Sequence, residues 1–262
     1  MPADGSVQLF DLTSAWSTVG LWGPRARDIL GSVSDADVSV EGFPFATCRS
    51  VEIDGMVVLA SRISYVGELG WELYVPMEQG ARLWRVLSDA GLPHGLVPVG
   101  IGVYGTTGRL EKGYRAYGNE LTSDYDLVTA GMSRASVKPQ AFIGKEAYLE
   151  QRELTPIATL CTLVVEDHRG RDGRRRYPLG KEPVLRTDGE RIVDGKGRPS
   201  FVTSAGSGPS VGRHLLMAYL PTEIAVEGAP FLVECMGERL PVSVAVAGSR
   251  PLFDPANARV RA

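Results

Sequence analysis

Residues 61–76 read SRISYVGELGWELYVP, and this stretch sets the fold of the first half of the chain. Its glycines predict a tight turn over 65–70. After the turn, apolar and polar residues alternate, which is typical of a strand because successive side chains point to opposite faces. Glu72 and Tyr74 share one face of that strand. The opposite, apolar face consists of Trp71, Leu73 and Val75.

Glu72 is the candidate binding residue of this strand. Tyr65 lies seven residues earlier, across the turn, which could fold the phenol back beside the carboxylate. A carboxylate beside an aromatic ring suits a flat heterocycle with adjacent N–H donors, because the carboxylate accepts two parallel hydrogen bonds while the ring packs on the aromatic. The alternative is an outward-facing glutamate on an edge strand, and the alternation alone favours that alternative.

A glycine-rich segment follows at residues 99–121, VGIGVYGTTGRLEKGYRAYGNEL. Gly100, Gly102 and Gly105 spell G-x-G-x-x-G, the fingerprint of nicotinamide-dependent dehydrogenases. That fingerprint needs a strand before it and a βαβ unit around it. Here the preceding apolar stretch is short and contains a proline, so we do not expect a dinucleotide fold.

The same segment has a second interpretation as a helix. Gly102, Gly105 and Gly108 recur every three residues and would leave one helix face without side chains, open to another backbone or to a flat ligand. Each glycine costs roughly 1 kcal/mol relative to alanine in a helix. Arg109 follows directly and is placed to pair with a ligand carboxylate. It could equally pair with a carboxylate of the chain itself, such as Glu111 or Glu120.

The pattern of secondary structure divides the chain near residue 154. Before it, strand and helix signals mix: Ser6–Asp11 alternates like a strand, Asp54-Gly55 marks a hairpin turn, and residues 78–90 predict an amphipathic helix. After it, short β-rich runs separated by Gly and Pro indicate a small β-barrel or sandwich. We therefore expect two domains, 1–154 and 155–262, in an α+β fold, and a tail at the last ten residues.

Composition excludes several classes of function. The net charge of −3 gives no general attraction to nucleic acid or to an anionic membrane. No apolar run approaches the roughly 20 residues that span a bilayer. The three cysteines and three histidines have neither disulfide nor metal-ligand spacing, so no metal site is expected. With no secretory signal visible at its start, the sequence is consistent with a cytoplasmic protein.

A basic stretch runs from Arg169 to Lys181. It would suit a polyglutamate tail or an acidic partner surface, although a solvated loop explains it more simply. The basic residues are Arg169, Arg171, Arg174, Arg175, Arg176 and Lys181.

Several segments, in order along the chain, resemble the glycine cleavage T-protein (aminomethyltransferase) family. Their amino-acid sequences are most similar to the folate-binding C-terminal part of dimethylglycine oxidase and dehydrogenase and of sarcosine dehydrogenase. The matching segments are LWGPRARD at 21–28, SYVGELGWELY at 64–74, RLEKGYR at 109–115, FIGK at 142–145, LGKEPV at 179–184, VTSA at 202–205 and YLP at 219–221.

The resemblance implies a partial folate-binding domain followed by a β-barrel domain. It implies that Tyr65 and Glu72 hold the pteridine ring of tetrahydrofolate, with Arg109 at the same site. It further implies transfer of a one-carbon unit from an N-methyl amine or aminomethyl donor to tetrahydrofolate, which gives 5,10-methylenetetrahydrofolate. Gly108 departs from the pattern, since the family more often has a bulky apolar residue there.

The resemblance also implies partners. The family's catalytic aspartate lies upstream of the 21–28 motif and has no counterpart at Asp4 or Asp11, so we assign no catalytic residue. FAD would belong to a partner or to a further domain. We therefore expect a flavoprotein or an N-terminal half on another chain, or self-association through uncovered apolar surface. The alternative function is a non-catalytic assembly module of a flavin-dependent amine demethylase.

Overall fold

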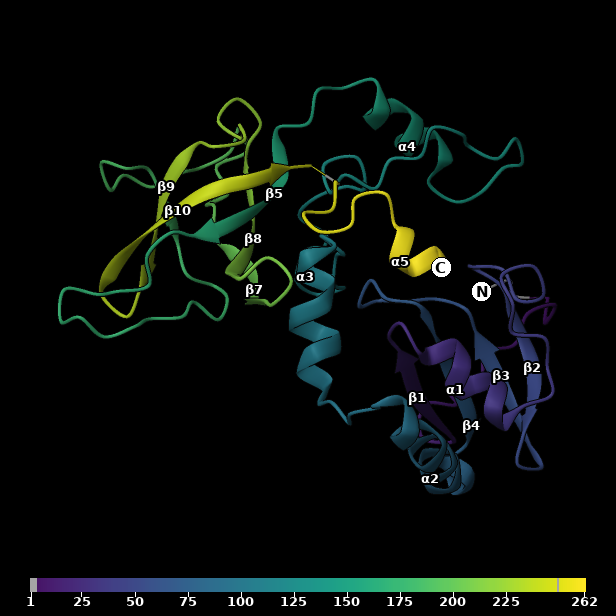
Figure 1. Cartoon of the computed structure of the whole chain (residues 1–262). Helices are drawn as coiled ribbons and strands as arrows, with labels where there is room; N and C mark the ends of the chain where they lie inside the picture. Colours follow the sequence, from purple (N-terminus) through teal and green to yellow (C-terminus); the bar gives the residue numbers. More distant parts are fainter. Residues whose placement is uncertain (1–3, 249) are drawn as a thin grey trace. The chain divides into compact units, whose positions relative to one another are not determined.

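The computed structural model describes residues 4–248 and 250–262, which form two compact units (Figure 1). Unit 1 comprises the chain up to Val99 together with Asn257–Ala262, and unit 2 comprises Gly100–Ala256. The predicted mixture of helix and sheet is confirmed. The chain passes from unit 1 to unit 2 between Val99 and Gly100. The predicted boundary near residue 154 falls between α4 (Lys145–Arg152) and β5 (Ala158–Val165), and as a domain boundary it stays a prediction.

Unit 1 is built on a four-stranded antiparallel sheet in the order β1-β4-β3-β2. The predicted hairpin turn at Asp54-Gly55 is confirmed. Both residues have positive φ, 48° and 71°, as the tightest two-residue hairpin turn requires. The strands are β1 (Trp16–Trp22), β2 (Cys48–Ile53), β3 (Met56–Ser61) and β4 (Gly70–Pro76).

Helices cover one face of this sheet. They are α1 (Ala26–Val33) and α2 (Gly80–Gly91), with short 3-10 turns at η1 (Met77–Gln79) and η2 (Leu92–His94). The predicted helix over 78–90 thus begins two residues late and ends at Gly91 as expected. Trp71, Leu73 and Val75 are fully buried against these helices, which confirms the predicted alternation. Glu72 lies on the opposite face of the sheet from these helices.

The two ends of the described chain behave differently from the expectation. Ser6–Asp11 forms no strand, because no neighbouring strand pairs with it, and its apolar side chains stay exposed. The expected tail at the last ten residues instead ends in a short helix, α5 (Ala258–Arg261), whose Val260 is buried. The guanidinium groups of Arg27 and Arg62 donate to the main-chain oxygen of Ala262 at 2.7 and 2.8 Å.

Unit 2 contains a six-stranded antiparallel sheet in the order β6-β9-β10-β5-β8-β7. The two edge strands, β6 and β7, are linked where they begin. The Val202 amide donates to the Glu182 carbonyl at 2.8 Å, and Pro183 pairs with Phe201. That link closes the sheet into the predicted barrel around an apolar core. The strands after β5 are β6 (Val184–Leu185), β7 (Val202–Gly208), β8 (Arg213–Pro221), β9 (Pro230–Cys235) and β10 (Glu238–Ala247).

The glycine-rich segment is helical, as the second interpretation expected. It forms a π-helical stretch, η3 (Val103–Gly108), which continues into α3 (Arg109–Glu111). The close approach of another backbone, which was expected at the glycines of this helix, depends on a different glycine. A Cβ added at Gly105 would meet no atom within 4 Å, whereas one added at Gly206 of β7 would lie 2.1 Å from the Thr106 carbonyl oxygen. The glycine that lets helix and barrel touch is therefore on the strand.

Among residues 4–248 and 250–262, none of the helices combines the length and the apolar character that crossing a bilayer requires.

Candidate functional site

Glu72 lies in the middle of the unit 1 sheet. Strand β4 is hydrogen-bonded to β1 on one side and to β3 on the other, so the edge-strand alternative is wrong. The register places Gly20 of β1 and Ser61 of β3 directly beside Glu72. The side chain is half-buried on the face opposite the helices. Both of these neighbours have small side chains.

The space above Gly20 is taken by the indole of Trp22. A Cβ built on Gly20 would lie 2.1 Å from the Trp22 ring, so the indole folds back over the strand next to Glu72. The indole nitrogen donates to the Ile63 carbonyl at 3.2 Å, which fixes the ring. Sequence reasoning did not single out Trp22. The signal was present, because residues two apart in a strand share a face and a glycine there leaves room for the ring.

The tyrosine that forms a hydrogen bond with the Glu72 carboxylate is Tyr74. Its hydroxyl donates to Glu72 Oε2 from two residues further along the same strand face. Tyr65 is half-buried on the turn before β4, and this turn is closed by Ser64 Oγ, which accepts the amides of Gly67 and Glu68 at 3.0 and 3.1 Å. The proximity of Tyr65 to Glu72 stays a prediction.

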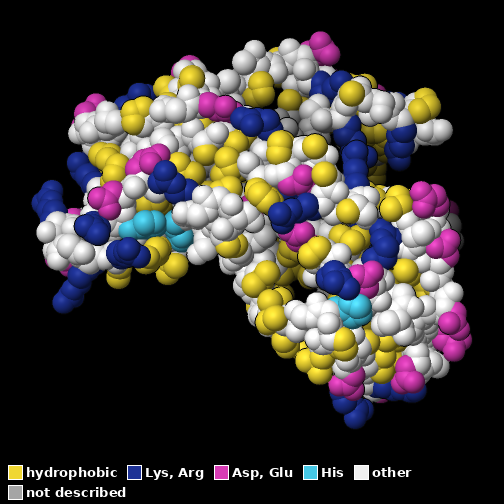
Figure 2. All heavy atoms as spheres, viewed as in Figure 1, with side chains coloured by type: hydrophobic (Ala, Val, Ile, Leu, Met, Phe, Trp, Pro, Cys, Tyr) yellow, Lys and Arg dark blue, Asp and Glu magenta, His cyan; other side chains and the backbone are white. Residues whose placement is uncertain are grey.

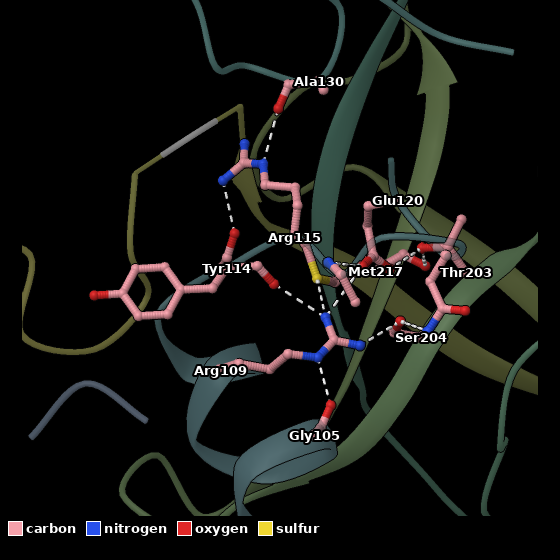
Figure 3. A network of polar contacts seen from close by, with 12 residues as sticks. Gly105, Arg109, Tyr114, Arg115, Glu120, Ala130, Thr203, Ser204 and Met217 are labelled. Carbon is pink, nitrogen blue, oxygen red and sulfur yellow. Dashed lines mark hydrogen bonds and ion pairs between the residues drawn. The ribbon is translucent and has the colours of Figure 1, made fainter. Parts of the chain in front are cut away.

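Arg109 belongs to unit 2, where its guanidinium is enclosed by protein acceptors (Figure 3). Nε donates to the Gly105 carbonyl, and one terminal nitrogen donates to Glu120 Oε2 at 3.1 Å. That nitrogen also donates to the Tyr114 carbonyl at 3.0 Å, and the other donates to Ser204 Oγ at 2.6 Å. The side chains of Arg109 and Glu120 are 1% and 0% exposed.

Glu120 is equally well hydrogen-bonded. One carboxylate oxygen accepts the Thr203 hydroxyl at 2.6 Å, and the other accepts the Ala116 amide at 2.9 Å in addition to Arg109. The ion pair thus joins α3 to the loop after it and to β7. A buried pair of charges needs such additional hydrogen bonds to offset its desolvation. The structure therefore shows the second of the two open alternatives for Arg109, pairing with a carboxylate of the chain.

The neighbours of Arg109 in the RLEK motif are also tied to the protein. Glu111 accepts the Ser210 amide at 2.6 Å, and Lys112 Nζ donates to the Asp254 carbonyl at 2.6 Å and pairs with its carboxylate at 3.3 Å. All three charged side chains of the motif are buried. In this structure the motif secures the helix–barrel contact of unit 2.

The described residues contain no cluster of three or more His, Cys, Asp or Glu side chains able to hold a metal ion. The cysteines they contain are free. Burial raises the pKa of the Cys161 thiol to about 12, so at neutral pH it stays protonated and is a poor nucleophile.

Two family models match the chain. The GCVT N-terminal domain covers residues 1–139, and the glycine cleavage T-protein C-terminal barrel domain covers residues 160–254. The chain is 33% identical to an aminomethyltransferase of Shouchella clausii over 90% of this chain and 60% of that protein. It is 31% identical to the mitochondrial dimethylglycine dehydrogenase of Mus musculus over 97% of this chain and 28% of that protein.

Among solved structures, the chain is similar to the glycine cleavage system aminomethyltransferase T from Bartonella henselae. The TM-score is 0.72 at 24% identity, over 92% of this chain and 60% of that one. The chain thus spans less than two thirds of the length of these relatives. The two domain models, in this order and over most of the sequence, show that the chain belongs to the glycine cleavage T-protein family of aminomethyltransferases.

Proposed function

We propose that unit 1 binds the pterin ring of tetrahydrofolate on the face of β4 that carries Glu72. The observation that supports this is the position of Glu72, half-buried on a central strand, beside Gly20 and the Trp22 ring that folds over it. A reduced pterin presents an amino group and a ring N–H next to each other, which is the pair of donors that one carboxylate can accept. The Glu72 carboxylate therefore offers the acceptors that the two pterin donors require.

Each residue has a distinct part in this proposal. Glu72 accepts the ring donors, Tyr74 orients the carboxylate through its hydroxyl, and the indole of Trp22 offers an aromatic wall. Tyr65 packs against the ring from the preceding turn. The part of Arg109 in folate binding stays a prediction, because its guanidinium donates to the Tyr114 carbonyl and to Glu120 within unit 2.

The reaction proposed is one-carbon transfer in the manner of the family. An N-methyl amine would first have to be oxidised by two electrons to an iminium, which FAD on another protein or domain would do, whereas an aminomethyl donor is already at that oxidation level. Two nitrogens of tetrahydrofolate then bond to the methylene carbon, the amine or ammonia leaves, and the product is 5,10-methylenetetrahydrofolate. This chain contributes the binding and orientation of the pterin edge and the exclusion of water from it. FAD would be carried by a partner protein or by a further domain. A cytoplasmic location stays a prediction.

Calorimetric titration with tetrahydrofolate tests the proposal, with the Glu72→Gln substitution as the decisive variant. We expect the substitution to weaken binding by about 1.5–3 kcal/mol, the range for a charged hydrogen bond. Glu52→Gln is the matched control, because Glu52 is an exposed carboxylate of β2 in the same sheet and should leave the affinity unchanged. Equal affinities of the Glu72→Gln variant and the unsubstituted protein would remove the pterin site.

A second candidate function, a non-catalytic assembly module, is favoured by the exposed apolar segment Val7–Leu12. Val7, Leu9, Phe10 and Leu12 are each more than half exposed. Contiguous exposed apolar side chains mark interaction surfaces. We propose that this segment binds an amine-oxidising flavoprotein or a second copy of the chain. Sedimentation of the protein, and of a Leu9→Glu/Phe10→Glu variant, tests this: association should be lost in the variant, and a monomer at all concentrations contradicts self-association.

A further inference from the structure

Unit 2 contains a cavity that the proposed folate site does not use. It has a volume of about 530 Å³ and lies between the hairpin of residues 168–176 and the turn that joins β7 to β8. Two histidines, a tyrosine and three arginines dominate its lining. These are His168, His214, Tyr177, Arg169, Arg175 and Arg213. Figure 2 shows a group of cyan histidine side chains on the outer surface of the molecule, with dark blue basic side chains beside it.

Two of these arginines lie directly opposite each other. Arg169 and Arg175 form an antiparallel pair in the hairpin, and both line the cavity. Like charges at directly opposed positions repel and destabilise a hairpin. Within residues 4–248 and 250–262, neither guanidinium has an ion-pair partner. The other arginines of the same hairpin each form an ion pair. Arg171 pairs with Glu238, and both Arg174 and Arg176 pair with Asp172.

The two histidines next to this pair are held by backbone carbonyls. His168 Nδ1 lies 3.0 Å from the Arg176 carbonyl, and His214 Nε2 lies 2.9 Å from the Pro178 carbonyl. A carbonyl only accepts, so these two ring nitrogens carry the protons. The remaining nitrogen of His214, Nδ1, is buried and has no partner among the described residues. His214 is only 8% exposed, and an unpaired polar atom at that depth is costly.

We propose that this cavity is an oxyanion site, in which Arg169 and Arg175 bind a phosphate or carboxylate group and the imidazoles of His168 and His214 form the adjacent wall. A bound oxyanion removes the repulsion between the opposed guanidinium groups. Paired guanidinium groups are well suited to the planar oxygen pairs of such ligands. The site is distinct from the face of β4, since it is formed entirely by unit 2.

The acids near the cavity are already engaged. Glu166 accepts from Ser243 and pairs with Arg213 at 3.5 Å, while Asp167 accepts the Arg169 amide at 2.9 Å. With three arginines against these two carboxylates, the lining has a net charge of +1 when both histidines are neutral. The cavity therefore favours an anion.

Binding should be linked to protonation of His214. Burial, together with the neighbouring His168, lowers the pKa of His214, while Glu182 acts in the opposite direction. Arg169, Arg175 and Arg213 add positive charge, and Glu166 and Asp167 add negative charge. A bound oxyanion favours the imidazolium form, so affinity should rise as the pH falls from about 8 to about 6.

The test uses the full chain and sulfate as the probe, because sulfate does not titrate in this pH range. Imidazole carbon–proton NMR resonances are followed during the titration. His168 and His214 should shift with saturation, and the shifts should be stronger near pH 6 than near pH 8. His94 belongs to unit 1 and is the internal control. No saturable shift of His168 and His214, or an equal shift of all three histidines, would overturn the proposal.

Matched variants separate a site from general attraction. Arg169→Gln should weaken sulfate binding by about tenfold or more, the equivalent of one charged hydrogen bond. Arg171→Gln removes the same charge from the same hairpin outside the cavity, and should change affinity less than twofold. Equal losses in the two variants would mean attraction to the basic hairpin as a whole, or to an acidic protein surface, and would refute the site.

Thermal unfolding of both variants confirms that the comparison is made on folded protein. Titration with inorganic phosphate and with glutarate then distinguishes the two sources of the oxyanion. Tighter binding of either one than of sulfate supports the site and identifies its class. If neither competes with sulfate, the proposal is wrong.

Discussion

Glu72 in unit 1 and Arg109 in unit 2 both carry a charge inside a motif typical of the family, yet the structure uses them differently. Glu72 is half-buried, with one described partner, the hydroxyl of Tyr74. Arg109 is fully buried and donates to four oxygens of the chain. The difference teaches that a motif residue is available to a ligand only where the fold leaves its hydrogen-bonding capacity unused.

The largest effect expected from this difference is on stability. Replacing Arg109 by Met leaves the Glu120 carboxylate buried without its cation, and breaking a buried pair by removing one partner costs about 3–5 kcal/mol. Urea unfolding measures this cost. Glu72→Gln, assayed in the same way, should change the free energy of unfolding by less than about 0.5 kcal/mol, as for other substitutions outside the core.

A double substitution makes the test sharper. Arg109→Met together with Glu120→Met removes both charges, so part of the lost stability should return. If Arg109→Met alone costs less than about 1 kcal/mol, the ion pair does not hold the helix to the barrel. Arg109 would then be free for the direct contact with folate that the sequence suggested.

Two glycines extend the comparison to packing. Gly206→Ala should destabilise the chain by about 1–3 kcal/mol, because the new methyl group meets the backbone carbonyl of Thr106, which cannot yield. Gly20→Ala meets the outer edge of the Trp22 ring, and a side chain can turn aside at the loss of its hydrogen bond to Ile63 more easily than a backbone can shift, so the cost should be smaller. Its main effect should be weaker tetrahydrofolate binding, since the ring is displaced from beside Glu72.

Thermal melts and folate titrations of both variants check these expectations. Gly105→Ala serves as a control for the helix. Its methyl group would enter open space, so the substitution should slightly stabilise the folded chain. A Gly20→Ala variant that binds tetrahydrofolate normally would exclude Trp22 from the site.

The smallest expected effect concerns alkaline pH. Burial and the nearby Asp194 carboxylate raise the pKa of Tyr125 to about 12, above its usual 10.0. The folded state therefore holds the phenol proton more tightly than the unfolded state. The stability this provides is present below pH 10 and is lost as the pH rises from 10 toward 12. Unfolding in urea at pH 9 and pH 11 should show a smaller decline for Tyr125→Phe than for the unsubstituted chain, and equal declines would contradict it.

Local pattern was enough to predict much of the fold. The alternation around Glu72 fixed which side chains face the core, because the period of a strand is two residues whatever its neighbours are. Asp54-Gly55 specified the hairpin, since few residue pairs accept positive φ twice in succession. The β-rich runs after residue 154 predicted a small barrel or sandwich, and the family resemblance favoured the barrel. Ser6–Asp11 has the same alternation and forms no strand, because a strand also needs a partner to pair with.

The sequence by itself determined the family, the strand that places Glu72 opposite its apolar face, and the C-terminal β-barrel domain. Only the tertiary structure decided that β4 is a central strand, that Trp22 folds over Gly20, and that Glu120 rather than a ligand pairs with Arg109. The reason is physical. Periodicity and turn chemistry act between residues close in sequence, whereas the pairing of a buried charge depends on which distant groups the folded chain brings within hydrogen-bonding distance.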